Sequence, residues 1–393
     1  FHREGPLVGL VYPQRQIYGA TVNTYIPVNE PLLAGNEKKY LIDCVETAWV
    51  SSEGPYVKKF EDSFSARVHR QHGISVTNGT TALELAVIAL GIGDGDEVIM
   101  PTFTIISCAA AVIRAGGIPV LVDCDPATWN MDTSQITEKI TSRTKAIMAV
   151  HIYGLPVDMD SVIKIAEKNN LFIIEDAAEA IGTLYKGRPC GSFGDISIFS
   201  FYANKHVTTG EGGMVVTNDS ELADRCRYYR NLCFGKERFI HEELGTNMRM
   251  TNIQAAIGLA QLERLDQTIS RKRLIGSRYT EQLQDISLIQ LPPAKTKYAE
   301  NDYWVFGLVV DQAFSLDAKA VMGLLGEKKI GSRPFFWPMH EQPVLRRRGL
   351  FAGEAYPVSE RIARRGFYIP CGAALTDGQL DRAAETLRRI LGF

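Results

Sequence analysis

Residues 171–217 read LFIIEDAAEAIGTLYKGRPCGSFGDISIFSFYANKHVTTGEGGMVVT, a stretch in which short apolar runs alternate with polar, glycine-rich segments. The apolar runs here and in the preceding residues are Glu97–Pro101, Ile118–Asp123, Ala146–Tyr153, Leu171–Asp176, Ile196–Phe201 and Gly213–Thr217. Runs of this length without polar alternation are typical of strands buried on both faces of a sheet. Helical patterns such as Met159–Asn169 lie between them, which predicts βαβ units and a mainly parallel sheet.

The remainder of the chain predicts a second, smaller domain. At about 150 residues per domain, 393 residues suffice for two domains or for one large domain with an appendage. Apolar residues at i, i+3, i+4 and i+7 predict a helix with one buried face at Ile253, Ala256, Ile257 and Ala260. We therefore expect an N-terminal extension over 1–24, a large three-layer α/β domain over 25–270 and a small C-terminal α+β domain over 271–393.

The composition argues against several classes of protein. The chain has 43 Lys and Arg residues and 45 Asp and Glu residues, and a net charge of −2 argues against a general nucleic-acid binder. Its longest uncharged stretch, Val98–Ile113, contains Pro101 and is shorter than the roughly 20 apolar residues of a transmembrane helix. The first residues carry no apolar signal region, and seven scattered cysteines without a Cys-x-x-Cys pair favour a reducing compartment and no metal site. We therefore expect a cytoplasmic protein that binds neither nucleic acid nor a membrane.

The segment Thr77–Leu83 (TNGTTAL) runs from a short predicted strand into a predicted helix. Gly79 allows close approach of the backbone, and Thr80 and Thr81 would present N–H groups and hydroxyls at the start of the helix. This arrangement is typical of an anion site at a helix N-terminus. An ordinary capped helix start is the alternative interpretation. The segment is not a Walker loop, because no Gly-Lys-Ser/Thr follows it.

Two ionisable residues follow neighbouring apolar runs. Asp176 ends one run, and a buried carboxylate needs a cation or several hydrogen-bond donors. It is therefore either a helix cap or the partner of a protonated ring nitrogen in a cofactor. Lys205 comes just after the next run and before several glycines. Its ammonium either reaches water or is partly desolvated, which would lower its pKa and make the amine a better nucleophile.

Two further segments lie near predicted strand ends or helix starts. Phe103 follows a predicted strand, where an aromatic ring either packs in the core or stacks on a planar ligand. Arg249 precedes the amphipathic helix and either lies on the surface or binds a carboxylate or phosphate.

Together, the segments supply a phosphate cradle, a carboxylate for a ring nitrogen, a lysine for a carbonyl and an aromatic ring. This set of groups fits pyridoxal 5′-phosphate (PLP).

Over residues 26–380, the chain resembles the DegT/StrS-type sugar-nucleotide aminotransferases. These are PLP enzymes of fold type I. The motifs that carry the resemblance are Ser200–Gly213 (SFYANKHVTTGEGG), Glu175–Gly182 (EDAAEAIG) and Asn247–Ala256 (NMRMTNIQAA). Within the family, Ile26–Phe60 and Arg333–His340 (RPFFWPMH) are most similar to the GDP-perosamine synthases.

The resemblance implies a role for each matched residue. Lys205 would be the Schiff-base lysine, and Asp176 would pair with the pyridinium nitrogen. The other implied cofactor contacts are Gly79, Thr80, Thr81 and Ser200 at the phosphate, Phe103 on the ring face, Glu179 at the ring hydroxyl and Asn247, which would reach a phosphate in the neighbouring subunit. The candidate substrate contacts are Arg249, Arg333 and His340. The family further implies a homodimer with shared active sites.

The implied reaction moves an amino group from L-glutamate to a nucleotide-linked keto sugar, at C4 of a 4-keto-6-deoxyhexose, for surface polysaccharides such as the lipopolysaccharide O-antigen or for glycosides. Related dehydratases have histidine in the place of Lys205, whereas here the histidine is His206, so transamination is favoured over deoxygenation. Met248 stands where the family often has tyrosine. The alternatives are amination at C3, a UDP- or dTDP-linked sugar, and a non-catalytic PLP-binding regulator. A nicotinamide oxidoreductase is disfavoured because no Gly-x-Gly-x-x-Gly follows the first strand.

Overall fold

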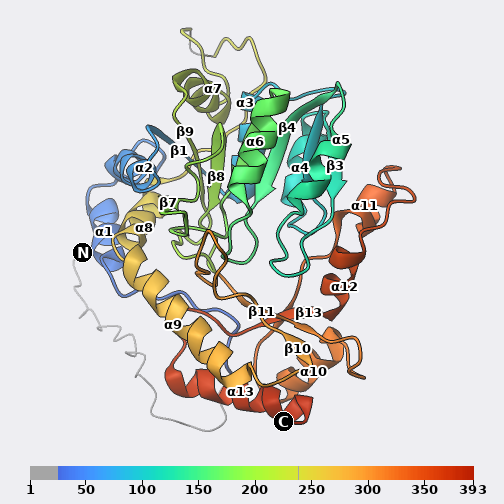
Figure 1. Ribbon diagram of the computed structural model, residues 1–393. Helices are drawn as coiled ribbons and strands as arrows, with labels where there is room; N and C mark the ends of the chain where they lie inside the picture. Colours follow the sequence, from blue (N-terminus) through green and yellow to red (C-terminus); the bar gives the residue numbers. More distant parts are fainter. Residues whose placement is uncertain (1–24, 238) are drawn as a thin grey trace, which may run out of the picture.

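The computed structural model describes residues 25–237 and 239–393, so the expected extension over 1–24 lies outside the described residues (Figure 1). Within that part of the chain, the largest sheet has seven strands in the order β1-β9-β8-β5-β4-β2-β3. Their bounds are β1 His72–Val76, β2 Glu97–Pro101, β3 Ile118–Val122, β4 Thr144–Val150, β5 Phe172–Asp176, β8 Ile196–Ser200 and β9 Gly213–Thr217. Strand β9 is antiparallel to both of its neighbours, and the other pairs are parallel. The mainly parallel sheet predicted from the apolar runs is confirmed.

Helices cover both faces of this sheet because successive side chains of each strand point to opposite faces. On strand β4, Met148 packs in a cluster with residues of α3, α4 and α7, whereas Ile147 packs with residues of α5 and α6. On strand β8, Phe199 packs with residues of α1, α2 and α8. The bounds are α1 Glu37–Glu46, α2 Pro55–Arg67, α3 Gly79–Ala89, α4 Ser107–Arg114, α5 Ile136–Lys139, α6 Met159–Asn169, α7 Ser220–Arg230 and α8 Asn252–Leu262. The result is the expected three-layer α/β arrangement.

Helix α8 differs from the expectation in the width of its buried face. Ala256 and Ala260 are buried as predicted, but Ile253 and Ile257 are only half-buried. The helix packs against both α1 and α2, so Ala255 is also fully buried. Because α8 contacts two helices, its buried face is different from the single stripe that the apolar spacing predicted.

The C-terminal part of the chain forms a second, antiparallel sheet of four strands in the order β10-β11-β13-β12. Its strands are β10 Ile289–Gln290, β11 Phe306–Val310, β12 Arg333–Pro334 and β13 Gly366–Ile369. The helices of this region are α9 Leu265–Leu283, α10 Ala318–Glu327, α11 Pro343–Arg346, α12 Pro357–Arg365 and α13 Asp377–Leu391. A short hairpin of β6 Leu184–Tyr185 and β7 Arg188–Pro189 lies between β5 and β8 in the sequence.

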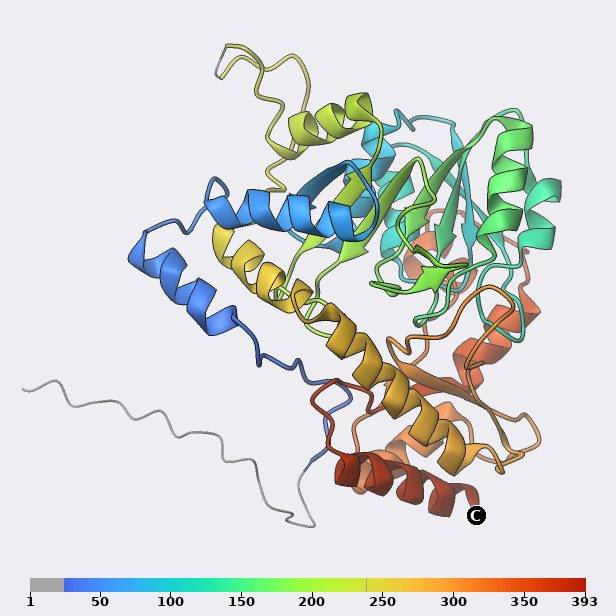
Figure 2. The same ribbon diagram turned by 60° about the vertical axis from the view of Figure 1, so that its left-hand side comes forward.

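Helix α9 joins the two parts, as Figure 2 shows. Its first residue, Leu265, and Ile269 pack with the core of the large sheet, whereas Tyr279 and Leu283 pack in the core of the small sheet. The expected boundary between residues 270 and 271 therefore falls inside a continuous helix. Among the described residues, no helix combines the length and the apolar character needed to cross a membrane.

Candidate active site

A cleft of about 500 Å³ opens at the carboxyl ends of the parallel strands, where ligands bind in open α/β sheets. Asp176 is the last residue of β5, Ser200 is the last residue of β8, and Lys205 lies in the loop after β8. The cleft is lined by six of the predicted residues: Gly79, Thr80, Asp176, Glu179, Ser200 and Lys205. The folded chain thus brings together residues from three separate segments of the sequence.

The Lys205 side chain is 9% exposed, and its ammonium lies among charged and aromatic groups. Its Nζ is 3.7 Å from Glu179 Oε1 and 3.6 Å from the centroid of the Trp304 ring. Burial lowers the pKa of Lys205, and the negative charges of Glu179 and Asp176 oppose that shift. A lysine with a lowered pKa has more of the neutral amine that attacks an aldehyde.

Asp176 is held at the bottom of the cleft by two donors. Its Oδ1 accepts a hydrogen bond from Ala178 N at 3.0 Å, and the Cys108 thiol lies 3.5 Å from Oδ2. Burial raises the pKa of Asp176, while the Ala178 amide and Lys205 lower it. Burying a carboxylate is costly unless a cation neutralises it. A protonated ring nitrogen is a cation that this carboxylate can stabilise.

Glu179 shares its environment with Lys205. Its Oε2 accepts a hydrogen bond from Tyr153 N at 3.0 Å. Burial raises the pKa of Glu179 to about 7, against the opposing effect of Lys205. When it is protonated, the carboxyl can donate a hydrogen bond to an oxygen atom in the cleft.

The anion cradle is built on the N-terminus of α3. Asn78 caps the helix, because its Oδ1 accepts from Thr81 N at 2.9 Å. The N–H groups of Gly79 and Thr80 precede the first intrahelical hydrogen bonds, so they have no acceptor within the helix. A Cβ on Gly79 would lie 2.7 Å from Ser200 Cβ, which shows how closely the two backbones approach. Phosphate groups bind at such helix starts.

These groups fit PLP. The chain offers N–H and hydroxyl donors for the phosphate, a buried carboxylate for the ring nitrogen and a desolvated lysine for the aldehyde, all around one cleft. All of these residues already line the same cleft.

The structure places two of the predicted cofactor contacts, Phe103 and Thr81, outside the lining of the cleft. Phe103 is fully buried and packs edge-on against Tyr153, with 5.9 Å between ring centroids, so it is not available to stack on a ligand. Ile105, two residues further on, lines the cleft instead and is 42% exposed. The Thr81 hydroxyl is used in the helix cap, where it donates to Asn78 O at 2.8 Å.

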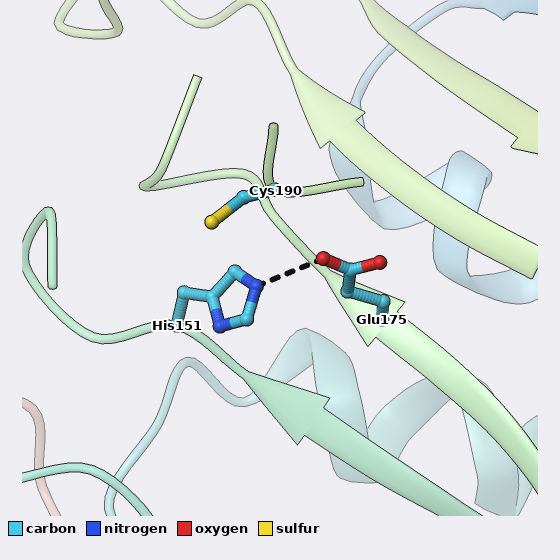
Figure 3. Close-up of side chains that lie close together, drawn as sticks. All are labelled: His151, Glu175 and Cys190. Atoms are coloured by element: carbon cyan, nitrogen blue, oxygen red, sulfur yellow. Dashed lines mark hydrogen bonds and ion pairs between the residues drawn. The ribbon is translucent and has the colours of Figure 1, made fainter. Parts of the chain in front are cut away.

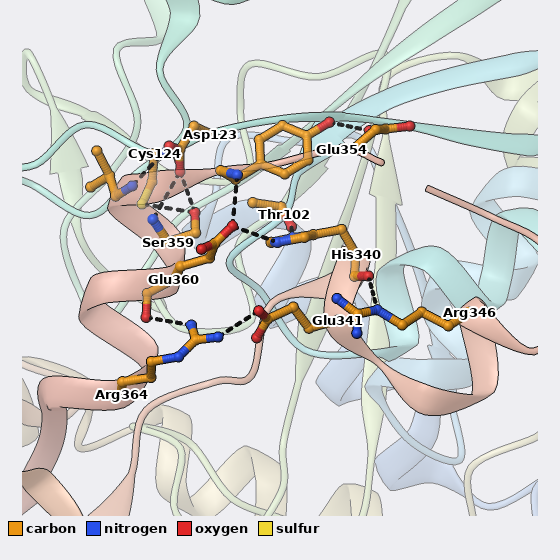
Figure 4. Close-up of polar contacts among 12 residues, drawn as sticks. Thr102, Asp123, Cys124, His340, Glu341, Arg346, Glu354, Ser359, Glu360 and Arg364 are labelled. Atoms are coloured by element: carbon orange, nitrogen blue, oxygen red, sulfur yellow. Dashed lines mark hydrogen bonds and ion pairs between the residues drawn. The ribbon is translucent and has the colours of Figure 1, made fainter. Parts of the chain in front are cut away.

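The structure places His340 outside the lining of the cleft. It is buried, its Nδ1 lies 2.9 Å from Thr102 Oγ1, and its Nε2 lies 3.1 Å from Glu360 Oε1 (Figure 4). The imidazole therefore joins the segment before α11 to the end of β2 and to α12. Both ring nitrogens are used in this link, so the role of His340 is structural.

The other predicted contacts lie outside the cleft of their own chain or at its edge. Asn247 is exposed, and its Oδ1 accepts from Arg249 Nε at 2.9 Å. Neither residue lines the cleft described above. Arg333 pairs with Tyr368 in the register of β12 and β13, and Tyr368 lines the cleft. Arg333 is exposed, so its charge lies at the edge of the cleft.

Sequence reasoning missed several residues of the cleft wall. Among these are Ser107, Trp304, Phe336 and Tyr368. Ser107 lies at the start of α4, and its hydroxyl is 2.8 Å from Thr80 Oγ1. Ser107 could have been proposed from its place at the start of a helix. The aromatic residues lie in apolar segments that are typical of a buried core, so the sequence did not indicate them as cleft residues.

One buried group has the composition of a metal site: His151, Glu175 and Cys190 (Figure 3). Glu175 lies 3.0 Å from His151 Nε2 and accepts hydrogen bonds from Gly194 N and Ser197 Oγ, both at 3.0 Å. Burial raises the pKa of Glu175, but the hydrogen bonds from His151, Gly191 N and Gly194 N outweigh burial and lower the pKa to about 2; burial also raises the pKa of the Cys190 thiol. Glu175 is thus the centre of a buried hydrogen-bond network that includes His151.

Comparison with known proteins agrees with this geometry. The model of the DegT/DnrJ/EryC1/StrS aminotransferase family matches residues 31–388. The GDP-perosamine synthase of Escherichia coli O157:H7 is 44% identical over 367 residues, which cover 93% of this chain and 98% of that protein. The GDP-perosamine synthase of Vibrio cholerae is 40% identical over 365 residues, with 92% and 98% covered.

Among solved structures, the PLP form of the sugar aminotransferase Spr1654 from Streptococcus pneumoniae superposes with a TM-score of 0.88. The two chains are 26% identical, and the match covers 93% of this chain and 98% of that one. The match to the family model over most of the chain and the shared fold lead to the same conclusion. This chain belongs to the DegT/DnrJ/EryC1/StrS aminotransferase family and is a PLP-dependent aminotransferase.

Proposed function

We propose that this enzyme moves an amino group from L-glutamate to C4 of a GDP-linked 4-keto-6-deoxyhexose. The observation that carries the reaction type is the position of the Lys205 amine, at 3.7 Å from Glu179, in the same cleft as Asp176 and the Gly79 cradle. The similarity to the two GDP-perosamine synthases supports the choice of sugar, position and nucleotide.

Each residue of the cleft has a distinct task in this proposal. PLP supplies an aldehyde that bonds to an amine and a ring that withdraws electrons from the attached carbon. Asp176 keeps the ring nitrogen protonated, and the N–H groups of Gly79 and Thr80 hold the phosphate. Lys205, once the amino acid has displaced it, takes a proton at Nζ from the α-carbon and gives it up later in the half-reaction. Burial favours this role because it keeps the amine partly neutral.

The proposal includes a homodimer in which each cleft is completed by the neighbouring subunit. Asn247 is exposed and lies outside the cleft of its own chain, which supports a contribution to another subunit. The first helix and the loop after it also expose large apolar side chains: Ile42 at 45%, Val45 at 69% and Trp49 at 48%. We place the enzyme in the cytoplasm, because its seven cysteines are all buried free thiols.

The nucleotide end of the substrate carries a diphosphate and requires cationic or N–H partners. Arg333 is the candidate for this contact, since it lies at the edge of the cleft beside Tyr368. The product would be an amino sugar nucleotide for a surface polysaccharide such as the O-antigen.

The first test measures the two half-reactions separately. Borohydride reduction of the PLP-loaded enzyme, followed by peptide mass spectrometry, should locate the cofactor on the peptide that contains Lys205. Glutamate alone should then release one 2-oxoglutarate per site from the unreduced enzyme. A PLP-binding regulator would release none, and trapping on a different lysine would contradict the assignment of Lys205.

The second test addresses the sugar. GDP-, dTDP- and UDP-linked 4-keto-6-deoxyhexoses and a 3-keto isomer are offered to the amine-loaded enzyme, and the products are identified by mass and NMR. We expect the GDP-linked 4-keto sugar to be aminated at C4 with the highest kcat/KM. Preference for another nucleotide or amination at C3 would overturn that part of the proposal and leave the transamination intact. Lys205→Ala is the matched inactive control.

A further inference from the structure

The indole ring of Trp304 packs against the ammonium of Lys205. Lys205 Nζ lies 3.6 Å from the ring centroid, and Trp304 is 5% exposed in the wall of the cleft. A cation over the face of an indole is attracted by the ring electrons, and the attraction is strongest where water is excluded. Trp304 reaches this place from the segment before β11, in the C-terminal part of the chain.

Both ends of Trp304 are held by hydrogen bonds. Its Nε1–H donates to the carbonyl of Asn204, the residue before the lysine, at 2.9 Å. Its own carbonyl accepts from Lys272 Nζ, also at 2.9 Å, and Lys272 is a buried residue of α9. The ring of Tyr153 lies against the indole, with 5.9 Å between the centroids. The orientation of the indole face toward Lys205 is therefore fixed by the fold.

Within the described part of the chain, the Lys205 ammonium also has a carboxylate partner. Glu179 Oε1 is 3.7 Å away, longer than a normal hydrogen bond. The titratable or charged groups that line the two cavities beside the lysine are Asp176, Glu179, Tyr202, Glu211 and Tyr368 in the cleft and Glu30, His206 and Lys272 behind it. The carboxylates stabilise the ammonium through their negative charge. The indole stabilises it through the electrons of its ring face and carries no net charge.

We infer that Trp304 is a positioning residue for Lys205, and that its indole face holds the ε-ammonium in place whenever this nitrogen is not bonded to the cofactor. The inference deepens the proposed transamination. In that reaction the lysine nitrogen gains a proton from the α-carbon of the amino acid and loses it again, so it exists as an ammonium between the two transfers. The indole stabilises this protonated state and keeps it over the cleft.

The test compares Trp304→Phe and Trp304→Leu with the parent protein in the cofactor-free state. Phenylalanine keeps a smaller aromatic face and removes the Nε1–H, whereas leucine removes the aromatic face. Competitive acetylation with acetic anhydride at a series of pH values, read peptide by peptide, measures the pKa of Lys205 directly. Lys272, which bonds to the backbone of residue 304 and not to its ring, serves as the internal reference for an intact fold.

We expect leucine to weaken proton binding at Lys205 by about tenfold or more, a downward shift of about one pH unit, with phenylalanine in between. If the ring acted only as packing, its removal would admit water and raise the pKa of Lys205, and that result, or no change, would overturn the inference. In the loaded enzyme, kcat for the glutamate half-reaction should fall and its pH profile should shift, while KM for glutamate stays within about twofold. Failure of the parent to react with glutamate would refute the proposed function, whereas the apoprotein titration tests Trp304 independently.

Discussion

Replacing Gly79 by alanine should disturb the anion cradle through a single steric contact. The added Cβ would lie 2.7 Å from Ser200 Cβ and 3.1 Å from Ser200 Oγ. Carbon atoms in contact normally lie about 3.5–4.0 Å apart, so the overlap is about 1 Å. Ser200 cannot retreat easily, because it ends β8 and pairs with Gly213 of β9.

The magnitude follows from two opposing effects. Overpacking of this kind costs about 1–3 kcal/mol. Alanine in place of glycine also raises the free energy of unfolding by about 0.4–1 kcal/mol, because it reduces the conformational freedom of the unfolded chain. We therefore expect Gly79→Ala to lower the free energy of unfolding by roughly 1–2 kcal/mol and to weaken PLP binding, since the displaced residues form the cradle.

Urea denaturation of the cofactor-free protein measures the stability, and absorbance titration with PLP measures the affinity. Two second-site variants separate the steric contact from the loss of a hydroxyl. Adding Ser200→Gly to Gly79→Ala removes the overlapping Cβ and should recover the stability that the alanine cost. Adding Ser200→Ala keeps the Cβ and relieves only the longer contact with Oγ, so it should recover less. Equal behaviour of the two double variants would refute the steric argument.

Three further predictions concern charged or polar residues of the fold. Asp176→Asn should keep PLP but lower transamination by about 10²–10⁴-fold, because an amide does not stabilise a protonated ring nitrogen; near-normal turnover with glutamate would rule out the role. The pKa of Glu175 is about 2, below its ordinary value of 4.5, so its contribution to stability is complete above pH 4.5 and is lost as the pH falls toward 2. Urea midpoints measured from pH 3 to 7 should therefore fall steeply at the acid end for the parent and less steeply for Glu175→Gln. Mixed dimers of Lys205→Ala and Asn247→Asp subunits should regain activity, because one of the two sites then has both residues intact; inactivity after demonstrated subunit exchange would place Asn247 in its own subunit's site or in none.

Much of the fold and the centre of the cleft could be predicted because both follow local rules. The runs Glu97–Pro101 and Gly213–Thr217 coincide with strands β2 and β9 residue for residue. Parallel strands place their carboxyl ends at one edge of a sheet. Asp176, Ser200 and Lys205 come at or after such ends, so their meeting in one cleft follows from the strand pattern.

The walls of the cleft could not be predicted, because they depend on how the chain bends after a strand. Phe103 and Ile105 are both apolar and follow β2, and no local pattern indicates which of the two turns into the core. His340 reaches Thr102 across 238 positions of sequence, a separation at which residue spacing carries no information. Trp304 lies in an apolar segment typical of a strand, and only the return of the C-terminal part to the large sheet places it beside Lys205.

Helix α9 has a consequence for the modularity of the enzyme. Leu265 and Leu283, at its two ends, belong to different hydrophobic cores, and its 19 residues span about 28 Å at 1.5 Å per residue. Neither core is complete without its half of the helix, so a cut after residue 270 would divide one continuous helix, with Leu265 and Ile269 left in one core and Tyr279 and Leu283 in the other. The two parts are therefore coupled through one rigid element and should melt together as a cooperative unit. Exchange of the C-terminal part between relatives would therefore have to preserve the contacts of both ends of the helix, because its first turns belong to the large-sheet core.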